Sequence, residues 1–321
     1  MASLTSTATA QDEPFFLVGS ERSGTTLLRL MLAHHRGIEC APEFEFLVER
    51  LPPREGWPAL APYYAWLSTN RIFLPHELAI DRRLDYPALA RSFLGQYARR
   101  SGKPIHGATC HKHFDRLLRL WPRARFVHLV RDGRDVARSC VGMGWAGNVW
   151  YGATRWVEAE ELWKSLLPRI DAARRLDLRY EDLLRDPERE LTRVCRFLGT
   201  EYDDRMLEYH RDSSYERPDP SLIGQWKKKL TRDELGLLEA RIGPWLQRWG
   251  YEATGVPATE VGLQRRSALW LDDRWGRFCF RRERYGLRLV LKSRLASLLG
   301  LASWKRAALL ARNEIDNRHL Q

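Results

Sequence analysis

The sequence predicts an α/β protein with a P-loop-like, doubly wound parallel sheet flanked by helices. Short apolar runs alternate with segments of helical periodicity through residues 14–199, a pattern typical of strands joined by crossover helices. Within the run 125–131, residues 126–130 are apolar apart from His128, as in a strand covered on both faces. In such folds ligands bind at the carboxyl ends of the strands. The residues that follow each run are therefore the first candidates for a site.

The predicted elements follow this alternation. Strands are expected at 15–18, 105–110, 125–131 and 176–180, with an extended segment over 37–46 that turns at Pro42 into a helix. Helices are expected from Gly24 onward, at 87–100, up to Leu120, and at 132–139, 151–175 and 188–198, the last ended by Gly199 as a C-cap. Residues 51–86, rich in Pro, Trp and Tyr, form an irregular or helical insertion, and residues 200–261 are expected to be largely helical.

We expect a disordered lead-in at 1–13, a main domain at 14–261 and a basic, mostly helical C-terminal extension at 262–321. The extension holds 14 Lys and Arg against 5 Asp and Glu, whereas the rest of the chain holds 39 against 36. Four of its leucines recur about one helical turn apart beside three cations: Leu287, Leu291, Leu295 and Leu298, with Arg288, Lys292 and Arg294. The extension is a solvated helical face, a surface for anionic glycan or nucleic acid, or an interfacial anchor at 286–311.

The bulk composition narrows the class of protein. A hydrophobic content of 44% and a charged content of 29% are typical of a soluble globular protein. No apolar run approaches the ~18 residues of a membrane-spanning helix, and residues 1–14 lack the pattern of a secretory signal. The 5 cysteines are scattered without C-x-x-C spacing, which argues against zinc and redox sites. We therefore expect a cytoplasmic protein, with peripheral membrane contact through the basic tail left open.

The stretch Gly19–Thr26 is the first candidate site, because it matches the phosphate-binding pattern GxxxxGK[ST] at all but one position. Thr25 stands where a lysine would reach the β- and γ-phosphates of a nucleoside triphosphate, which argues against ATP or GTP hydrolysis. A loop leading into a helix still offers N–H groups and a positive dipole end to an anion. Arg22 adds a bidentate cation. The alternative is an ordinary turn between a strand and a helix.

Two further strand ends carry chemistry. Arg131 ends the fourth run and Ser139 lies about two turns along the next helix, so the pair could grip a second phosphate. Alternatively, Arg131 pairs with Asp132 or Asp135 at the surface. Glu43 follows the first helix and could accept a hydroxyl proton beside bound anions, or could simply favour a helix N-terminus.

Lys112 follows the third strand between His111 and His113. It could place a positive charge on a leaving oxygen, and either histidine could act as a base or a metal ligand. No third ligand stands at a recognisable spacing, so we expect no metal.

Together, the stretches Phe16–Leu28 and Phe126–Ser139 resemble the sulfotransferase family that uses 3′-phosphoadenosine 5′-phosphosulfate (PAPS). The likeness is greatest to the branch with protein-tyrosine sulfotransferases and many bacterial members. It continues through 178–188 to Gly199, weakly to Gly224–Lys227, and covers roughly residues 14–250.

The resemblance implies a sulfotransferase domain that moves a sulfuryl group from PAPS to an acceptor hydroxyl by in-line displacement, without a metal. It implies a 5′-phosphosulfate loop made by Arg22, Ser23, Gly24, Thr25 and Thr26. Arg131 and Ser139 would bind the 3′-phosphate. Tyr180, Trp226 and Lys227 would help to hold the nucleotide.

The resemblance also implies catalytic roles. Glu43 lies 21 residues after Arg22, where the tyrosine-sulfating branch places its base, and His113 is a reserve candidate. Lys112 matches a lysine that stabilises the transition state, and Arg22 would help it to neutralise the bridging oxygen. Two departures stand out. Glu21 replaces the usual proline and would have to point away from the phosphosulfate, and His-Lys-His-Phe replaces the common Asp-Lys-Thr-Pro around Lys112.

Two other classes of function compete with a sulfotransferase. A degenerate P-loop kinase would need a Walker lysine and a Mg²⁺-binding Asp, which the sequence does not pair. A non-catalytic protein would bind anionic glycan or, less favoured, nucleic acid through the tail. For the acceptor, a glycan, glycolipid or small metabolite is favoured over peptide tyrosine, because no secretory signal is seen and the Trp/Tyr-rich segment 57–73 could stack on rings.

Overall fold

The computed structural model of the chain describes residues 13–320, which form two compact units. The first unit comprises the chain up to Leu67, Ile72–Arg131 and Glu158–Ile223, and the second comprises Ser68–Arg71, Asp132–Val157 and the chain from Gly224 onward. Residues 1–12 of the predicted lead-in lie outside the described residues.

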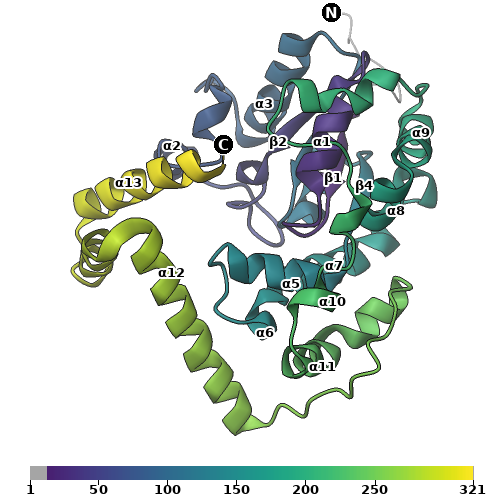
Figure 1. Cartoon of the computed structure of the whole chain (residues 1–321). Coiled ribbons are helices and arrows are strands. Elements are labelled where there is room, and N and C mark those ends of the chain that lie inside the picture. The colour runs from purple at the N-terminus through teal and green to yellow at the C-terminus, as the bar shows by residue number, and fades with distance from the viewer. Residues whose placement is uncertain (1–12, 321) are drawn as a thin grey trace, which may run out of the picture. The chain divides into compact units, whose positions relative to one another are not determined.

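The first unit is built on a five-stranded sheet in which all neighbouring strands are parallel (Figure 1). Its strands are β1 (Phe15–Val18), β2 (Ile38–Glu43), β3 (Ile105–Cys110), β4 (Arg125–Val130) and β5 (Arg175–Arg179). In their order, β2-β3-β1-β4-β5, β2 forms one edge of the sheet, β3 lies between β2 and β1, and β4 and β5 extend the sheet on the other side of β1. This doubly wound topology confirms the predicted α/β fold, and in folds of this topology ligands bind at the carboxyl ends of the strands.

Helices cover this sheet and make up most of the second unit. Helices of the first unit are α1 (Thr25–His34), α2 (Leu60–Leu67), α3 (Tyr86–Ser101), α4 (Leu117–Leu120), α8 (Tyr180–Arg185) and α9 (Pro187–Leu198). Helix α7 (Thr154–Leu166) starts in the second unit and continues into the first. The second unit holds α5 (Gly133–Gly142), α6 (Val149–Gly152), α10 (Trp226–Lys229), α11 (Arg232–Arg248), α12 (Leu263–Leu298) and α13 (Ala302–Leu320).

Three local predictions were wrong. The long helix expected over 151–175 ends at Leu166, and Pro168 lies in the 3₁₀ turn that follows, because proline cannot continue an α-helix. Residues 200–261 are helical only in α10 and α11, apart from short 3₁₀ turns. After Pro42 the chain makes a single 3₁₀ turn, Glu45–Leu47. Gly199, in contrast, caps α9 with a φ of 84°, as predicted.

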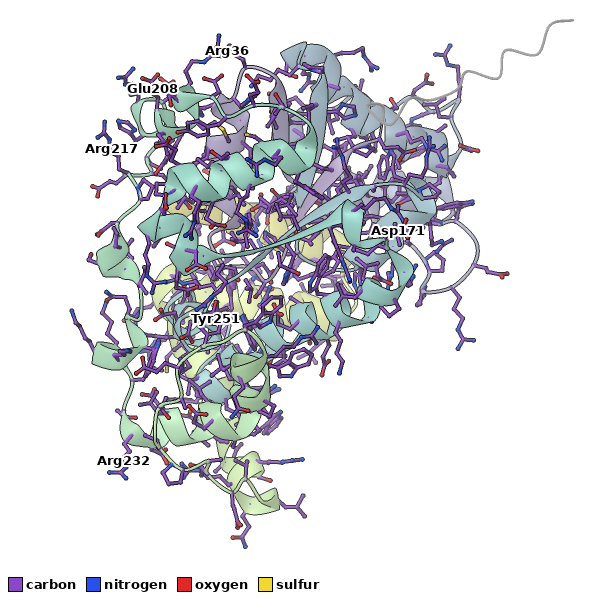
Figure 2. The ribbon with its side chains drawn as sticks, turned by 90° about the vertical axis from the view of Figure 1, so that its right-hand side faces the viewer. Arg36, Asp171, Glu208, Arg217, Arg232 and Tyr251 are labelled. Atoms are coloured by element: carbon purple, nitrogen blue, oxygen red, sulfur yellow. The ribbon has the colours of Figure 1, made fainter. Side chains whose placement is uncertain are left out.

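The core of the first unit lies between the sheet and helices α1, α8 and α9. β1 is buried along its whole length, which fits its place in the middle of the sheet. One face of the sheet packs against apolar residues of these helices: Leu28, Met31 and Leu32 from α1, Leu183 and Leu184 from α8, and Leu191 and Val194 from α9. Charged residues such as Arg36 and Arg217 occupy the rim of this unit (Figure 2).

The basic C-terminal extension is helical, as predicted, and packs within the second unit. In α12 the buried Asp273 accepts a hydrogen bond of 2.8 Å from the Gly147 backbone and pairs with Arg277. The helix is interrupted at Gly286, whose φ of 75° and ψ of 149° are not helical, and Figure 1 shows α12 and α13 joined end to end by a turn. Among the described residues, no helix is both long and apolar enough to cross a bilayer.

A buried charged triad joins β4, β5 and α7 in the first unit. His128 is fully buried, its Nδ1 donates to Asp177 at 3.0 Å, and its Nε2 lies 3.4 Å from Glu160. Trp163 stacks on the imidazole and donates to the same Asp177 oxygen at 2.9 Å. Burial alone would lower the pKa of His128, but Glu160 and Asp177 outweigh it and raise the pKa to about 9.

We expect this triad to make the stability of the fold pH-dependent. Because the pKa of His128 is higher in the folded protein than the ~6.5 of an exposed histidine, its contribution is complete below about pH 6.5 and is lost as the pH rises through about 9. The contribution is about 3 kcal/mol at most. Thermal unfolding from pH 6 to 10 should show wild-type stability falling across this window. His128→Gln should be less stable at pH 6 and fall less; an equal decline in both proteins would contradict the assignment.

Candidate active site

The loop between β1 and α1 is held close to its neighbours by two glycines. Gly19 has a φ of 145°, and a Cβ there would lie 2.3 Å from the carbonyl oxygen of Leu129 on β4. Gly24 has a φ of 92°, and its Cβ would lie 2.2 Å from the ring of Tyr180 on α8. Arg22, between them, has a φ of 69°, which is uncommon for a residue other than glycine. The loop shape therefore depends on glycine at both ends.

This loop leads into a helix end that can accept an anion. Within the described chain, no side chain hydrogen-bonds to cap the N-terminus of α1, and its first turn carries no acidic residue. Its N–H groups and the positive end of its dipole are therefore available. The side chains of Ser23 and Thr25 are buried, Thr26 is half-buried and Arg22 is exposed. An anion would meet backbone N–H groups and the Arg22 guanidinium.

Arg131, directly after β4, brings a second cation to the loop. Its Nη1 donates to the carbonyl oxygen of Arg22 at 3.3 Å, and its guanidinium lies 4.5 Å from the centroid of the Tyr180 ring. Tyr180 begins α8 and packs against Gly24. Four residues that the sequence predicts to hold the donor, Arg22, Gly24, Arg131 and Tyr180, are thus together in the first unit.

Of the other predicted donor residues, Ser139, Trp226 and Lys227 lie in the second unit. Ser139 is half-buried on α5, and Trp226 is buried at the start of α10. The Trp226 backbone N–H donates to Asp135 at 2.7 Å, and the Arg134 guanidinium lies 3.7 Å from the centroid of the Trp226 ring.

Two polar side chains of α5 therefore position the segment that carries Trp226. Arg134 is in turn held by Asp132, with Nη2 and Oδ2 2.7 Å apart. Lys227 pairs with Glu252 at 2.6 Å. The sequence interpretation missed the role of Arg134 and Asp135, although both belong to the same Asp-Gly-Arg-Asp stretch that follows Arg131.

His111 links the end of β3 to the glycine loop. Its Nδ1 lies 2.9 Å from the carbonyl oxygen of Gly19, so this nitrogen carries a proton and donates it. Its backbone N–H donates to Glu45 Oε1 at 2.9 Å. Burial would lower the pKa of the buried His111 side chain, but the charges of Glu45, Glu21 and Glu43 outweigh burial and raise it. The protonated Nδ1 therefore holds the loop through the Gly19 carbonyl, and the neighbouring carboxylates favour the charged form of the imidazole.

Glu45 is a site residue that the sequence interpretation missed. Its side chain is buried, and its Oε2 has no hydrogen-bond partner among the described residues. Burial raises the pKa of Glu45, and the charge of His111 opposes the rise. Because Glu43 and Glu45 are two positions apart, spacing alone could have drawn attention to this second carboxylate.

The structure shows where Glu21, the unexpected residue of the loop, points. Its Oε1 lies 3.1 Å from Nζ of Lys112, and both side chains are partly exposed. Glu21 therefore pairs with the lysine that is predicted to stabilise the transition state. The ion pair also holds the tip of the loop to the end of β3.

Glu43, the predicted base, is the last residue of β2 and is half-buried. Its carbonyl oxygen accepts a hydrogen bond of 3.0 Å from His76, and the pairing of β2 with β3 shifts register between Ala41 and Glu43. The shift marks a β-bulge or similar irregularity at the end of the strand that carries Glu43. The Glu43 carboxylate is close enough to the imidazole to raise the pKa of His111.

His113, the reserve candidate, has a left-handed backbone with a φ of 51° before the 3₁₀ turn Phe114–Arg116. Burial and the charge of Arg116 lower its pKa, which keeps the imidazole neutral near pH 7. Within the part of the chain that the structure describes, no group of three His, Cys, Asp or Glu could hold a metal ion.

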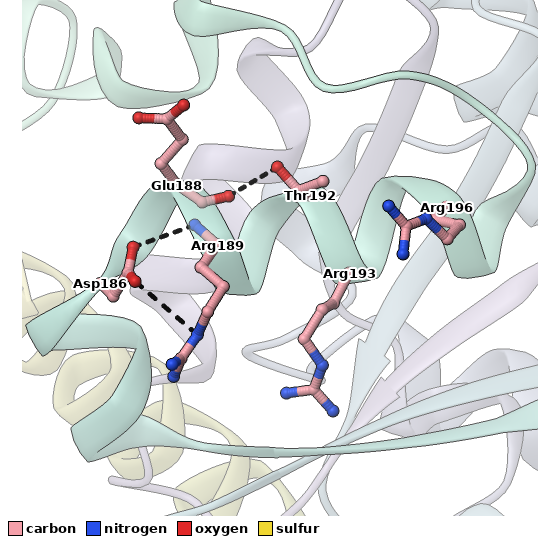
Figure 3. A pocket seen from close by; sticks show the side chains of 6 residues that line it. All are labelled: Asp186, Glu188, Arg189, Thr192, Arg193 and Arg196. Atoms are coloured by element: carbon pink, nitrogen blue, oxygen red, sulfur yellow. Dashed lines mark hydrogen bonds and ion pairs between the residues drawn. The ribbon is translucent and has the colours of Figure 1, made fainter.

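A separate hollow of about 320 Å³ lies on α9, away from these residues in the sequence. Figure 3 shows that its six lining side chains come from one stretch of helix: Asp186, Glu188, Arg189, Thr192, Arg193 and Arg196. Asp186 accepts from the Arg189 backbone at 3.1 Å and thereby caps the helix. These contacts stabilise α9, and the hollow contains none of the candidate site residues.

Residues 14–204, which carry the loop, β1 to β5 and the first-unit site, match the model of the sulfotransferase family. The chain therefore belongs to the sulfotransferase family and is a transferase. It is 29% identical over 271 residues to protein-tyrosine sulfotransferase 2 of Gallus gallus, covering 75% of this chain and 70% of that protein. It is 25% identical over 304 residues to the omega-hydroxy-beta-dihydromenaquinone-9 sulfotransferase Stf3 of Mycobacterium bovis, covering 75% of this chain and 76% of that protein.

Two solved structures share the fold. A sulfotransferase domain from the curacin biosynthetic pathway superposes with a TM-score of 0.54 and 18% identity, covering 75% of this chain and 98% of that one. A sulfotransferase domain from the Synechococcus PCC 7002 olefin synthase gives a TM-score of 0.54 and 22% identity, covering 75% and 95%. Both similarities concern the fold.

We expect Gly24→Ala to destabilise the protein more than the matched substitution Gly199→Ala. Both glycines have left-handed backbones, but nothing lies within 4 Å of a Cβ at Gly199, whereas a Cβ at Gly24 would clash with Tyr180. A left-handed alanine costs about 1 kcal/mol, and overpacking adds roughly 1–3 kcal/mol at Gly24. Urea unfolding measures the difference, and equal losses in the two variants would mean that the loop is not held against Tyr180.

Proposed function

We propose that this sulfotransferase takes its sulfuryl group from PAPS and transfers it to an acceptor hydroxyl. When bound, PAPS supplies an activated sulfuryl group. The observation that carries the proposal is the Gly19–Thr26 loop, an anion cradle with Arg22 in place and Thr25 where a nucleoside triphosphatase has lysine. The same missing lysine disfavours a degenerate P-loop kinase.

The residues present suit a donor that carries phosphates at both ends of an adenosine. The α1 N-terminus and Arg22 would hold the 5′ end, and Arg131 the 3′-phosphate, with Ser139 as its proposed partner. Tyr180 already stacks with Arg131 and would steady it. Trp226 would contribute to the nucleotide site, and Lys227 would have to exchange Glu252 for a phosphate.

In this proposal Glu43 takes the proton from the acceptor hydroxyl. Lys112 would place its positive charge near the oxygen that leaves, as phosphoryl-transfer enzymes do with a cation. His111 would not touch the reacting atoms. Its hydrogen bond to the Gly19 carbonyl would keep the loop in place.

The acceptor is proposed to be a glycan, a glycolipid or a small metabolite, with peptide tyrosine as the second candidate because of the similarity to protein-tyrosine sulfotransferase 2. Trp57, expected to stack on rings, already contacts Tyr86 and Arg119. A hollow of about 230 Å³ beside Tyr63 and Trp66 offers aromatic surface instead.

Mass spectrometry of cell extracts incubated with enzyme and PAPS should reveal products with an added sulfuryl group; donor binding without any such product would favour a non-catalytic protein.

Glu43→Gln should lower kcat by about 100-fold or more, the usual worth of a positioned base, while adenosine 3′,5′-bisphosphate (PAP) binds as to wild type. Glu39→Gln is a matched control, because Glu39 lies on the same strand and pairs with Lys103 at 3.7 Å. Its turnover should stay near that of wild type. Near-normal turnover of Glu43→Gln with PAP binding intact would remove Glu43 from the role of base.

Glu21→Gln should change PAP affinity and kcat in opposite directions. Removing the negative charge beside the anion loop should tighten PAP binding a few-fold, whereas loss of the partner that holds Lys112 should lower kcat by about tenfold. Calorimetry and steady-state kinetics measure the two effects. In a Lys112→Met background the same substitution should change kcat no further. If Glu21→Gln lowers kcat equally in both backgrounds, Glu21 does not act through Lys112.

A further inference from the structure

The helix after Gly286 presents a row of leucines to solvent. Leu287, Leu291, Leu295 and Leu298, here called the leucine face, are 47%, 45%, 50% and 82% exposed. At 100° per residue they fall within one stripe of the helix. Solvent-facing leucines in a continuous row are unusual for a soluble helix, because they leave apolar area in water.

The opposite side of the same helix is the one that packs. Val290 and Ala296 are buried, at 6% and 0% exposure, and lie away from the stripe of leucines on the helix circumference. The helix therefore already has an apolar contact with the rest of its unit. The leucine face is a second apolar surface, and about half or more of each of its side chains stays exposed among the described residues.

Cations flank the leucine face on both sides. Arg288 and Lys292 follow Leu287 and Leu291 by one position, and Arg294 lies on the other edge. The Lys292 ammonium lies 5.9 Å from the ring centroid of Trp304, which is 48% exposed on α13. Leu299 and Leu301 continue the apolar surface around the turn between the helices, at 65% and 38% exposure.

We propose that the leucine face docks on an anionic lipid bilayer. Exposed leucine, a tryptophan at the edge and a basic flank are the composition of a helix that lies in a membrane interface. Charge complementarity selects this occupant, because residues 262–321 carry 14 Lys and Arg against 5 Asp and Glu. A second copy would bring the same positive charge, whereas an anionic leaflet attracts each cation. The attachment is peripheral, since no described helix could span the bilayer.

The test is co-sedimentation of the full chain with vesicles of phosphatidylcholine containing 30% phosphatidylserine, and with phosphatidylcholine alone. Wild type should bind the first and bind the second at least tenfold more weakly. Leu291→Asp with Leu295→Asp should reduce binding at least tenfold, from lost apolar burial and repulsion by the lipid. Leu222→Asp with Leu74→Asp is the matched control, because these leucines are 46% and 43% exposed outside the extension, and it should bind like wild type.

Variants of the flanking cations form the second part of the vesicle-binding experiment. Arg288→Gln with Lys292→Gln should weaken binding by about fivefold for each lost charge, and added salt should weaken wild-type binding in the same direction. Arg54→Gln with Arg99→Gln removes two exposed cations elsewhere and should have little effect. Circular dichroism and light scattering accompany each variant to report folding and assembly.

The proposal fails if wild type does not sediment with the anionic vesicles, or if the leucine variant binds as well as wild type. It also fails if light scattering shows a dimer that the leucine variant converts to a monomer while vesicle binding is absent, because the face would then join two copies. These assays need neither donor nor acceptor. Their outcome is therefore independent of the proposed reaction.

Discussion

The close approach of the Gly19–Gly24 loop to its neighbours is the constraint on which the rest of the site depends. A carbonyl of β4 fills the space beside Gly19, and the Tyr180 ring fills the space beside Gly24. The same ring stacks with Arg131, which in turn donates to the loop at Arg22. These contacts thus bring the N-terminus of α1, two arginines and an aromatic ring together around the loop, without a Walker lysine.

The charges that the loop can offer to a ligand differ from those around His111, which contacts the loop backbone. Arg22 and Arg131 offer positive charge to a ligand, whereas Glu21, Glu43 and Glu45 gather near His111 and raise its pKa. The buried imidazole holds the loop backbone by donating to the Gly19 carbonyl. Lys112 follows β3 and pairs with Glu21 of the loop. The proposed donor site therefore combines cations for a polyanion with a carboxylate, Glu43, that is proposed to receive a proton.

Features carried by contiguous residues could be predicted from the sequence, and those that depend on strand order could not. The β1 run, the paired glycines and the helical repeat after Gly24 are local, and so the loop was placed correctly. The partner of Glu21 lies on β3, and the Glu45 contact crosses from the end of β2 to His111. Neither could be inferred until the order β2-β3-β1 was known. The prediction of one helix over 151–175 was wrong for a local reason, because Pro168 lies within that stretch and proline cannot continue an α-helix.

The most direct test of the central claim is calorimetric titration of the full chain with PAP and with adenosine 5′-monophosphate. If Arg131 and the loop form a site for a donor phosphorylated at both ends, PAP should bind at least tenfold more tightly than the monophosphate. Arg131→Gln should remove most of that difference while the protein stays folded. Equal affinity for the two nucleotides in wild type would contradict the assignment of this loop and Arg131 to a PAPS site.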